Sequence, residues 1–369
     1  MNHRPVDLVT CLLGPLPGLR ELDLLTPDQP LRPYPPVHRW RYNGLIRVVI
    51  FALLLVVIAL VAGLAVALLL GWALGDQARI AGIAQRWQTA LGIPVTLGAY
   101  LLLVCWIEQR RPPFEMAPRR LLGEVGRGLA LGAALQLGCV GALALLGAYR
   151  VHGVDWSYNP VWMLVMAGFG AAIMEEVLFR GILYRIVEGT LGSWAAVGIS
   201  ALVFGLSHVP NPQGTWQGGI AIALEAGLLF AVLYALTRSL WLVMGVHFAW
   251  NMVQGPVLGI VVSGQSGQGS GYLKSTLTGP QWLSGGPFGM EASMVTVALL
   301  AALAVWLLVQ LHRRQLVVAP FWVRRRLLTA RQLVAEPSAA QPWGTAAAAD
   351  ADPDGGPEPG QSDPATPQA

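Results

Sequence analysis

Charged residues are scarce in this chain of 369 residues, since only 12% are Asp, Glu, Lys or Arg. Soluble globular domains carry roughly 25% charged residues, so this composition excludes an ordinary soluble protein. Hydrophobic residues make up 54% of the chain. The net charge of +4 does not indicate nucleic-acid binding, because the arginines lie in short segments between apolar runs. We therefore expect a membrane protein without a nucleic-acid partner.

Cysteine is also scarce, and its spacing is uninformative. Cys11, Cys105 and Cys139 are the three cysteines, and no CxxC spacing occurs. The cysteines therefore indicate neither a disulfide framework nor a thiolate metal site. The first 40 residues are rich in proline and lack the early apolar stretch of a secretory signal, so we expect a segment that is not cleaved and lies outside the membrane.

Long apolar runs are abundant instead. A bilayer core of about 30 Å requires roughly 20 mostly apolar helical residues for each crossing. Eight runs separated by polar or Gly/Pro breaks are candidates: 45–74, 91–107, 127–148, 160–187, 193–208, 218–237, 240–262 and 293–311. The predicted fold class is all-α, a polytopic membrane helix bundle of about eight transmembrane helices. In the third run, Gly128, Gly132 and Ala133 would allow close contact with another helix.

The arginines predict the orientation of this bundle in the cell membrane. They gather before the first run, after the second and after the last, at Arg32, Arg39, Arg41, Arg110, Arg111, Arg119, Arg120, Arg313, Arg314, Arg324, Arg325 and Arg326. With eight crossings these segments share one side, and the positive-inside rule places both termini in the cytoplasm.

Composition then divides the chain into four parts. Residues 1–44 are expected to form a cytoplasmic segment, 45–311 the transmembrane bundle and 312–335 a basic juxtamembrane segment. Residues 336–369 form a tail too poor in large apolar residues to order itself. The Gly/Ser/Gln-rich loop 263–292 is expected to be flexible, and neither it nor the tail to carry chemistry.

Few polar residues lie within the runs, and such residues are usually paired or functional because burying a charge in a bilayer costs about 2.5–3.5 kcal/mol. Glu176 and Arg180 stand one helical turn apart and can pair. Glu175 points about 100° away and is free for another task. A buried ion pair that only locks two helices is the alternative reading, but one arginine cannot neutralise two carboxylates in a dry site.

Two histidines complete this set. His208 ends the fifth run, four residues after Phe204, and His247 is followed at the same spacing by Asn251. Glu175 and His208 lie at comparable depths, roughly 20–24 Å from the turn between their helices, while His247 is roughly 12 Å from its own turn. The three can therefore meet only if the seventh helix is tilted or displaced. Their rarity in apolar runs favours one shared site.

These residues form three ordered motifs, Glu-Glu-x-x-x-Arg, Phe-x-x-x-His and His-x-x-x-Asn, which resemble those of the type II CAAX prenyl protease and bacteriocin-processing family of intramembrane proteases. The resemblance covers about residues 160–262, and three motifs in order on separate helices are specific. It implies a protease core at 160–262 and a hydrolase that cleaves a peptide bond near the C terminus or the membrane-proximal part of a peptide or protein substrate. The substrate's identity, including whether it is lipidated, is not readable from the sequence.

The resemblance implies two alternative mechanisms. In one, Glu175 and His208 activate water, His247 and Asn251 stabilise the oxyanion, and Glu176 and Arg180 hold these groups. In the other, the family's metalloendopeptidase label is literal, and Glu175, His208 and His247 bind zinc. We favour the first, because an amide is an uncommon zinc ligand and no HExxH helix occurs; the cofactor stays open between zinc and none. Phe204 is expected to pack.

Other functions stay open beside proteolysis. Some relatives are thought to act as scaffolds or bacteriocin-immunity proteins, and buried Glu, His and Arg sets also form proton relays in transporters. Transporters usually show repeated halves with interrupted helices, which this chain lacks. In the sixth run, Glu225 is expected to be a buried carboxylate paired with a tryptophan N–H or a backbone donor, or else a wall of the substrate cavity.

Overall fold

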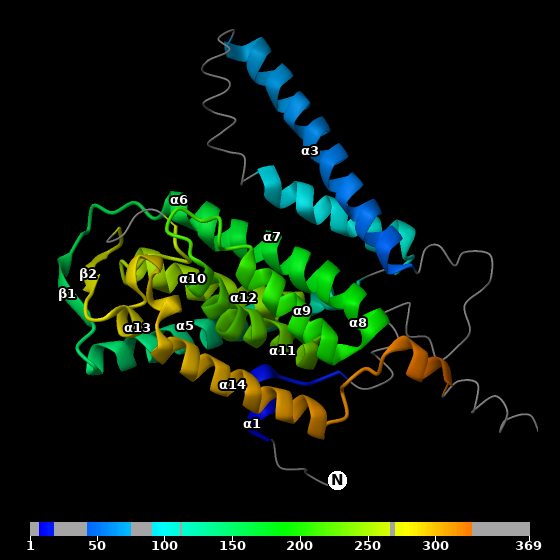
Figure 1. The fold of residues 1–369 in the computed structure, drawn as a ribbon. Helices are drawn as coiled ribbons and strands as arrows, with labels where there is room; N and C mark the ends of the chain where they lie inside the picture. Colours follow the sequence, from blue (N-terminus) through cyan, green and yellow to red (C-terminus); the bar gives the residue numbers. More distant parts are fainter. Residues whose placement is uncertain (1–6, 18–42, 75–90, 111–112, 266–269, 327–369) are drawn as a thin grey trace, which may run out of the picture. The chain divides into compact units, whose positions relative to one another are not determined.

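A computed structural model describes residues 7–17, 43–74, 91–110, 113–265 and 270–326 of the chain (Figure 1). Helices dominate these residues. The helices that precede the site-bearing segment are α1 (Leu8–Leu13), α3 (Gly44–Leu74), the helix Leu91–Ile107 with its π-helical end η2 (Leu103–Ile107), and α5 (Leu121–Leu145). The predicted tail 336–369 lies outside the described residues.

The central part of the chain forms helices with several π-helical turns. One continuous helix runs through α6 (Val161–Met163), η5 (Leu164–Ala171), α7 (Ala172–Glu176), η6 (Val177–Tyr184) and α8 (Arg185–Leu191). It is followed by α9 (Ser193–Leu206), α10 (Trp216–Ile222), η7 (Ala223–Gly227), α11 (Leu228–Thr237), α12 (Leu240–Met252) and η8 (Val253–Val257). The last long helix is α14 (Met294–Arg313).

Five helices of the described residues are long and apolar enough to cross a membrane: Gly44–Val66, Pro118–Leu145, Val161–Leu191, Trp216–Thr237 and Met294–Arg313. Leu91–Ile107 and Ser193–Leu206 are shorter apolar helices. The predicted class, a polytopic helical membrane protein, is confirmed. The seventh predicted run, 240–262, is helical only to Val257, since Pro256 and Gly259, with φ at +67°, end it.

Polar caps fix where several of these helices begin. Ser239 accepts a hydrogen bond from the Leu242 amide at the start of α12, and Ser293 accepts one from the Val295 amide at the start of α14. Side-chain caps of this kind satisfy amides that the helix itself leaves unpaired. Gly192, with φ at +86°, turns the chain between α8 and α9 where a Cβ would lie 2.8 Å from the Val318 carbonyl oxygen.

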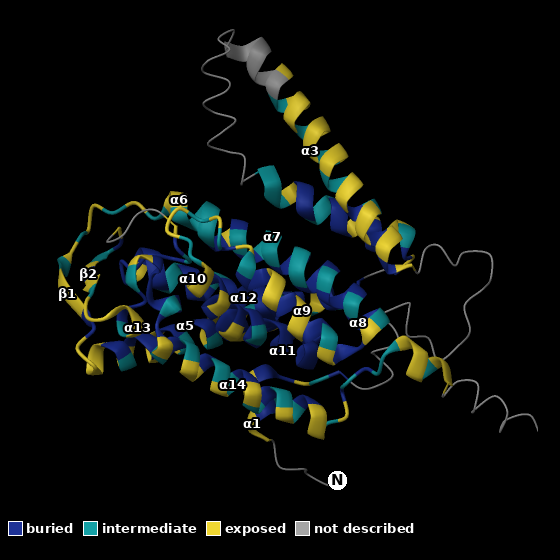
Figure 2. Cartoon of the chain, viewed as in Figure 1, coloured by how far each residue is buried: buried dark blue, intermediate teal, exposed yellow. Residues whose placement is uncertain are grey.

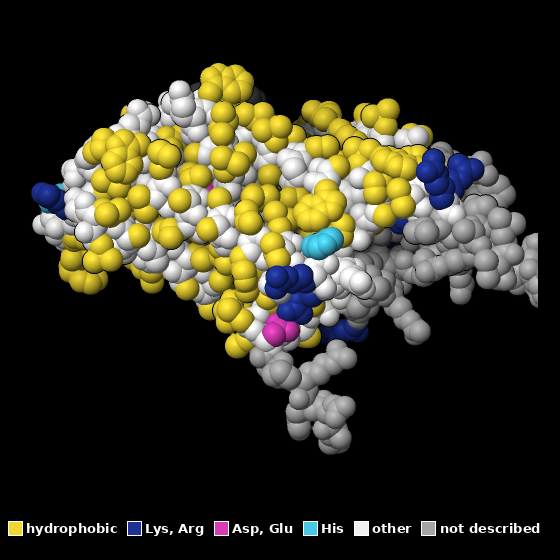
Figure 3. All heavy atoms as spheres, turned by 60° about the horizontal axis from the view of Figure 1, so that its bottom comes forward, with side chains coloured by type: hydrophobic (Ala, Val, Ile, Leu, Met, Phe, Trp, Pro, Cys, Tyr) yellow, Lys and Arg dark blue, Asp and Glu magenta, His cyan; other side chains and the backbone are white. Residues whose placement is uncertain are grey.

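The helices differ sharply in burial (Figure 2). In the most apolar stretch of Trp216–Thr237, 83% of the residues are buried, so this helix forms the centre of the bundle. In α3 the corresponding share is only 6%. Hydrophobic side chains also dominate the face drawn in Figure 3, where charged side chains gather in a few places. Exposed apolar surface on this scale is expected of helices that face lipid.

Helices α5 and α12 pack backbone against backbone. A Cβ on Gly128 would lie 2.3 Å from the Leu242 carbonyl oxygen, and one on Gly132 would lie 2.3 Å from the Val246 carbonyl oxygen. Only glycine permits such an approach of two backbones. The close contact predicted for Gly128 and Gly132 is therefore present, and it sets the position of the helix that carries His247.

A small sheet departs from the purely helical prediction. Strand β1 (Tyr149–Val154) pairs antiparallel with β2 (Leu273–Leu277), with Tyr149 opposite Leu277. β2 lies in the loop 263–292, which also contains the short helices α13 (Gln281–Ser284), η9 (Gly286–Phe288) and η10 (Met290–Ala292). The described part of this loop is therefore structured, because its backbone bonds pair with residues far away in the sequence. The pairing places the segment that follows α5 beside the loop that precedes α14.

Candidate active site

The seven predicted site residues come from four elements that pack together. Glu175 and Glu176 end α7, Arg180 lies on η6, Phe204 lies on α9 with His208 just beyond it, and α12 carries His247 and Asn251. All of these residues except Glu175 are buried. Glu175 keeps 29% of its side chain exposed, so it is the member of the set that an outside molecule can reach.

Glu176 joins two helices through one oxygen atom. Its Oε1 accepts a hydrogen bond from Arg180 Nη1 at 3.0 Å and another from His247 Nδ1 at 2.9 Å. Both partners are buried with it, so the carboxylate offsets the guanidinium charge without help from water. The predicted Glu176–Arg180 pair is present. The bond to His247 follows from the position of α12 and was not foreseen.

Glu175 and His208 form a second, looser pair. His208 Nδ1 donates to the Phe204 carbonyl oxygen at 2.8 Å, since a carbonyl oxygen can only accept. This bond leaves Nε2 directed to Glu175 Oε2, 3.8 Å away. That separation is too long for a direct hydrogen bond, and Glu175 Oε2 has no hydrogen-bond partner among the described residues. The gap is one that a bridging water can close.

Phe204 contacts most of the other site residues. Its ring centroid lies 4.5 Å from the Arg180 guanidinium carbon, 4.9 Å from the His208 ring and 6.1 Å from the His247 ring. Phe230, which was not predicted, lies 5.3 Å from the same guanidinium and 5.2 Å from the His247 ring. Phe204 packs as predicted, and its ring face also contacts the buried Arg180 guanidinium in a cation–π interaction.

Asn251 and Arg180 are held by backbone carbonyl groups that no sequence pattern indicated. Asn251 Nδ2 donates to the Ala167 carbonyl oxygen at 2.8 Å, which occupies one of its two N–H groups. Arg180 Nη2 donates to the Gly227 carbonyl oxygen at 3.1 Å. These bonds fix the two side chains from η5 and η7, and one amide N–H of Asn251 stays available for another acceptor.

These contacts also bear on the depth of His247, which the sequence places nearer to its own turn than Glu175 and His208 are to theirs. His247 reaches Glu176 although its turn is nearer, because α12 packs along α7 and its neighbours. His247 therefore lies beside the glutamate pair, as a shared site requires.

The donor set does not fit zinc as arranged here. Across the described ranges, no three His, Cys, Asp or Glu side chains come together in a way that could hold a metal ion. The Nδ1 atoms of His208 and His247 bond other groups, which leaves both Nε2 atoms available. The three side chains Glu175, His208 and His247 are nevertheless not gathered into a metal-binding group in the described residues.

Glu225 lies outside this site, and the partner predicted for it is wrong. Both of its carboxylate oxygens are buried without a hydrogen-bond partner among the described residues. The tryptophan donor goes elsewhere, because Trp250 Nε1 donates to Glu291 Oε1 at 3.1 Å. The sequence does not indicate which of the two buried glutamates, Glu225 or Glu291, accepts the hydrogen bond of the Trp250 indole.

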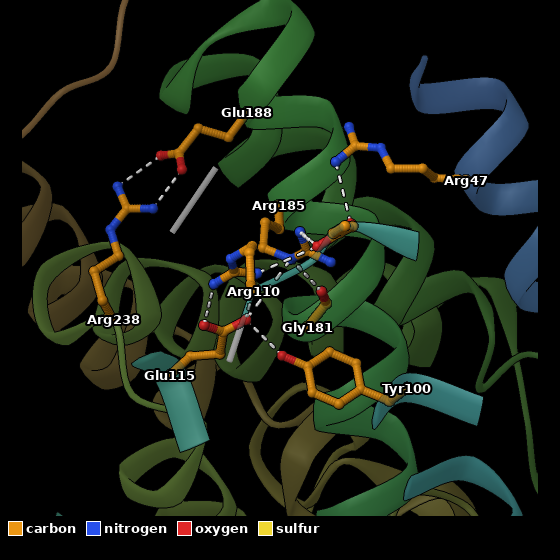
Figure 4. A network of polar contacts seen from close by, with 9 residues as sticks. Arg47, Tyr100, Arg110, Glu115, Gly181, Arg185, Glu188 and Arg238 are labelled. Atoms are coloured by element: carbon orange, nitrogen blue, oxygen red, sulfur yellow. Dashed lines mark hydrogen bonds and ion pairs between the residues drawn. The ribbon is translucent and has the colours of Figure 1, made fainter. Parts of the chain in front are cut away.

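A buried ionic network at the ends of several helices was also missed (Figure 4). Glu108 bonds Arg47 of α3 at 3.2 Å and Arg185 of α8 at 2.6 Å, while Glu115 bonds Arg110 at 2.5 Å. Burial alone would raise the pKa of Glu108, but the attraction of Arg185, Arg47 and Arg110 lowers it to about 2. The network therefore ties α3 to the helix that carries Glu175.

A second ion pair joins the same end of the bundle. Arg238 bonds the Glu188 carboxylate through both terminal nitrogens, with 2.7 Å between Nη2 and Oε1. Ser193 donates to the same oxygen at 2.6 Å and Tyr184 at 3.1 Å. Bidentate pairs of this kind are strong and directional, so this end of the bundle is rigidly connected.

The fold and these contacts define a polytopic helical membrane protein with a buried Glu/His/Arg/Asn centre. Residues 157–253 match the family profile described as type II CAAX prenyl endopeptidase Rce1-like, and all seven site residues lie within this segment. The resemblance predicted from the sequence is therefore confirmed over these residues.

A curated relative gives weaker support. "Putative membrane peptidase YdiL" of Bacillus subtilis (strain 168) is 26% identical over 126 residues, which are 34% of this chain and 46% of that protein. The chain thus spans about half the length of this relative. No solved structure gives a significant match.

Proposed function

We propose that this chain is an intramembrane endopeptidase of the CAAX type, a hydrolase that cleaves a peptide bond with a water activated by Glu175 and His208. The observation that carries the proposal is the 3.8 Å gap between Glu175 Oε2 and His208 Nε2, beside the exposed face of Glu175. A water at this gap would contact the Glu175 carboxylate and His208 Nε2 at once. Positioned pairs of this kind contribute typically 10²–10⁴-fold to a proton-transfer step.

In the proposed reaction, Glu175 takes one proton from this water, and the hydroxide oxygen attacks the carbonyl carbon of the scissile peptide. The carbonyl oxygen becomes an oxyanion, which the free N–H of Asn251 and the ring of His247 stabilise. The peptide C–N bond then breaks as Glu175 returns its proton to the leaving nitrogen. Glu176 and Arg180 act as positioning residues, because they reach the reacting groups only through His247 and Phe204.

The proposed substrate is a peptide or protein whose scissile bond lies near its C terminus or close to the membrane. The matched family is described by its action on prenylated CAAX ends, which supports a test of lipidated substrates for this chain. A bundle embedded in the cell membrane with both termini in the cytoplasm fits such a substrate, which would approach along the bilayer.

The decisive experiment compares protein termini in cells that carry the wild type or Glu175→Gln. We expect a set of new C termini that appears with the wild type, disappears with Glu175→Gln and is restored when the wild-type gene returns. The purified wild-type protein should cleave synthetic peptides that span these positions, with and without a lipid group. Unchanged termini together with an intact cellular phenotype in Glu175→Gln would instead favour a scaffold or immunity protein.

A further inference from the structure

Glu291 is a buried glutamate of η10 that the proposed reaction does not use. Three hydrogen-bond donors meet its two carboxylate oxygens. Oε1 accepts from Trp250 Nε1 at 3.1 Å and from Ser263 Oγ at 3.1 Å, while Oε2 accepts from the Ser263 amide at 2.5 Å. Because Trp250 lies on α12 and Ser263 in the loop that follows η8, this one side chain bonds two separate parts of the chain.

The bond to Trp250 lies beside the candidate site. Trp250 directly precedes Asn251 on α12, and His247 lies about one helical turn earlier. The Trp250 side chain is buried, and an indole has a single N–H, which here goes to Glu291. Glu291 therefore fixes the turn of α12 that carries Asn251 against η10.

The bonds to Ser263 continue to the turn that carries His208. Asn211 Nδ2 donates to the Ser263 carbonyl oxygen at 2.6 Å, and the Gln213 amide donates to the Gly264 carbonyl oxygen at 2.8 Å. Within the turn, the Asn211 amide donates to the His208 carbonyl oxygen at 3.2 Å. Ser263 and Gly264 therefore hold the chain directly beyond His208.

The backbone at Ser263 and Gly264 adopts a conformation that its surroundings must impose. Their φ angles are +48° and +69°, and serine rarely occupies this left-handed region. Strained residues of this kind persist where neighbouring bonds over-determine them. Those bonds are the two from Ser263 to Glu291 and one from the Gly264 amide to the Phe288 carbonyl oxygen at 2.9 Å. Ser263 thus joins Glu291 to Asn211 in a fixed geometry.

The three donors together call for a carboxylate at position 291. Glutamine has the same size, but it has one acceptor oxygen, and its amide nitrogen would face an N–H group of Trp250 or of Ser263. One of these two buried N–H groups would then lose its acceptor, which is costly inside a protein. A glutamine at this position therefore keeps one of the two connections and loses the other.

We propose that Glu291 is a positioning residue of the candidate site, which holds the turn carrying His208 in place relative to α12. The 3.8 Å separation between His208 Nε2 and Glu175 Oε2 depends on where this turn lies. The expected effect of Glu291 on cleavage rests on the proposed function. Its effect on the accessibility of His208 does not, so the two can be measured apart.

The test measures how fast diethyl pyrocarbonate modifies His208 in the purified full chain in detergent at neutral pH, by mass spectrometry. Only 10% of the His208 side chain is exposed, so the reagent should react slowly with the wild type. His312, exposed on α14, is the internal reference. We expect the relative rate at His208 to rise about tenfold in Glu291→Gln, since the loss of one hydrogen bond to a charged group shifts an opening equilibrium by about this factor. Cleavage should lose kcat rather than KM.

Lys274→Gln is the matched control in the same loop. It removes an ion pair with Asp155 in which 60% of the lysine side chain is exposed, and it leaves the bonds of Glu291 intact. Exposed ion pairs contribute little to stability. The rate at His208 should therefore stay at the wild-type value in this variant.

A double variant tests whether the two connections act in series. Asn211→Ala breaks the bond to the Ser263 carbonyl oxygen, and Trp250→Phe breaks the bond to Glu291 while it keeps an aromatic ring. Either break alone disconnects the turn from α12, so the double variant should show no faster modification of His208 than the more reactive single variant. Additive increases would mean that the two bonds act independently, and would overturn the proposal.

An unchanged rate at His208 in folded Glu291→Gln would also overturn it, whatever happens to cleavage. A faster rate combined with wild-type cleavage would uphold the positioning of His208 by Glu291 and would contradict the proposed function of His208 instead. If Glu291→Gln does not fold, the rates in Asn211→Ala, Trp250→Phe and the double variant decide.

Discussion

At the scale of single residues, the two adjacent glutamates have opposite surroundings. Glu176 is fully buried and accepts bonds from Arg180 and His247, whereas Glu175 is partly exposed and its Oε2 lacks a partner. A one-residue step along a helix turns a side chain by about 100°, which is enough to give the two carboxylates different surroundings. The proposed function assigns stability to Glu176 and chemistry to Glu175.

Replacement of Glu176 should therefore destabilise the protein far more than replacement of Glu175. Glu176→Gln keeps the side-chain size but leaves the buried Arg180 charge uncompensated, which costs about 3–5 kcal/mol. Glu175→Gln should leave the unfolding temperature near that of the wild type while it abolishes cleavage. Thermal unfolding of both variants in detergent checks this, and equal losses of stability would contradict the division of roles.

Phe204 offers a second test at this scale. Phe204→Leu keeps an apolar side chain but removes the ring that faces the Arg180 guanidinium, a contact worth about 2 kcal/mol when it is shielded from water. We expect lower stability and a larger loss of activity, since His208 and His247 also rest on this ring. Unfolding temperatures of Phe204→Leu, Arg180→Met and the double variant give the coupling between the two residues. Additive effects would show that the ring only fills space.

Several of these contacts could be predicted from the sequence and others could not. The Glu176–Arg180 pair follows from a spacing of four residues on one helix. The bond from His247 to Glu176 depends on where one helix lies along another, which the chain's local pattern does not encode. The same limit explains the wrong partner given to Glu225.

At the scale of elements, the contact between α5 and α12 determines where His247 stands. Gly128 and Gly132 present bare backbone to α12, and Gly245 of α12 does the same towards α5, where a Cβ would lie 2.7 Å from the Val125 carbonyl oxygen. In lipid, close backbone packing of this kind replaces the hydrophobic effect as a cause of helix association. A shift of α12 would carry His247 and Asn251 with it.

Gly132→Ala should accordingly reduce both stability and activity. The added Cβ meets the Val246 carbonyl oxygen at 2.3 Å, one residue from His247, and overpacking of this type costs about 1–3 kcal/mol. Gly138→Ala is the matched control on the same helix, since no atom lies within 4 Å of its Cβ. The control should be neutral or slightly stabilising. Thermal unfolding and cleavage assays of the pair decide, and a Gly132→Ala variant with normal activity would refute the role of this contact.

The helices were easier to predict than the sheet. Eight apolar runs stand out because a bilayer requires long apolar stretches, and all eight contain helix in the structure. Strand β2 lies in a segment rich in glycine, serine and glutamine, and its partner β1 is 119 residues earlier, between Val154 and Leu273. Two short strands that depend on each other over such a distance leave no local signal in the sequence.

At the scale of the whole described bundle, the ionic network around Glu108 links stability to acid. The pKa of Glu108 is lowered from 4.5 to about 2 by the nearby arginines, so its stabilising effect is complete above about pH 4.5. The effect, about 3 kcal/mol, is lost as the pH falls from about 4.5 towards 2. Glu108→Gln should be less stable at neutral pH and should lose less on acidification. Unfolding temperatures across this range test the difference, and identical pH profiles would contradict it.

The pairing of β1 with β2 has a further consequence for the history of such proteins. The chain enters the site-bearing segment after Val154 and leaves it before Leu273, two residues that face each other across the sheet. The segment matched by the family profile, 157–253, lies entirely between them. A stretch whose two ends meet can be exchanged between hosts as a cassette, provided that the host supplies a helix with glycines where α12 must dock. The helices outside the cassette are then free to diverge, and relatives should retain the enclosed segment while their flanking helices differ in number and sequence.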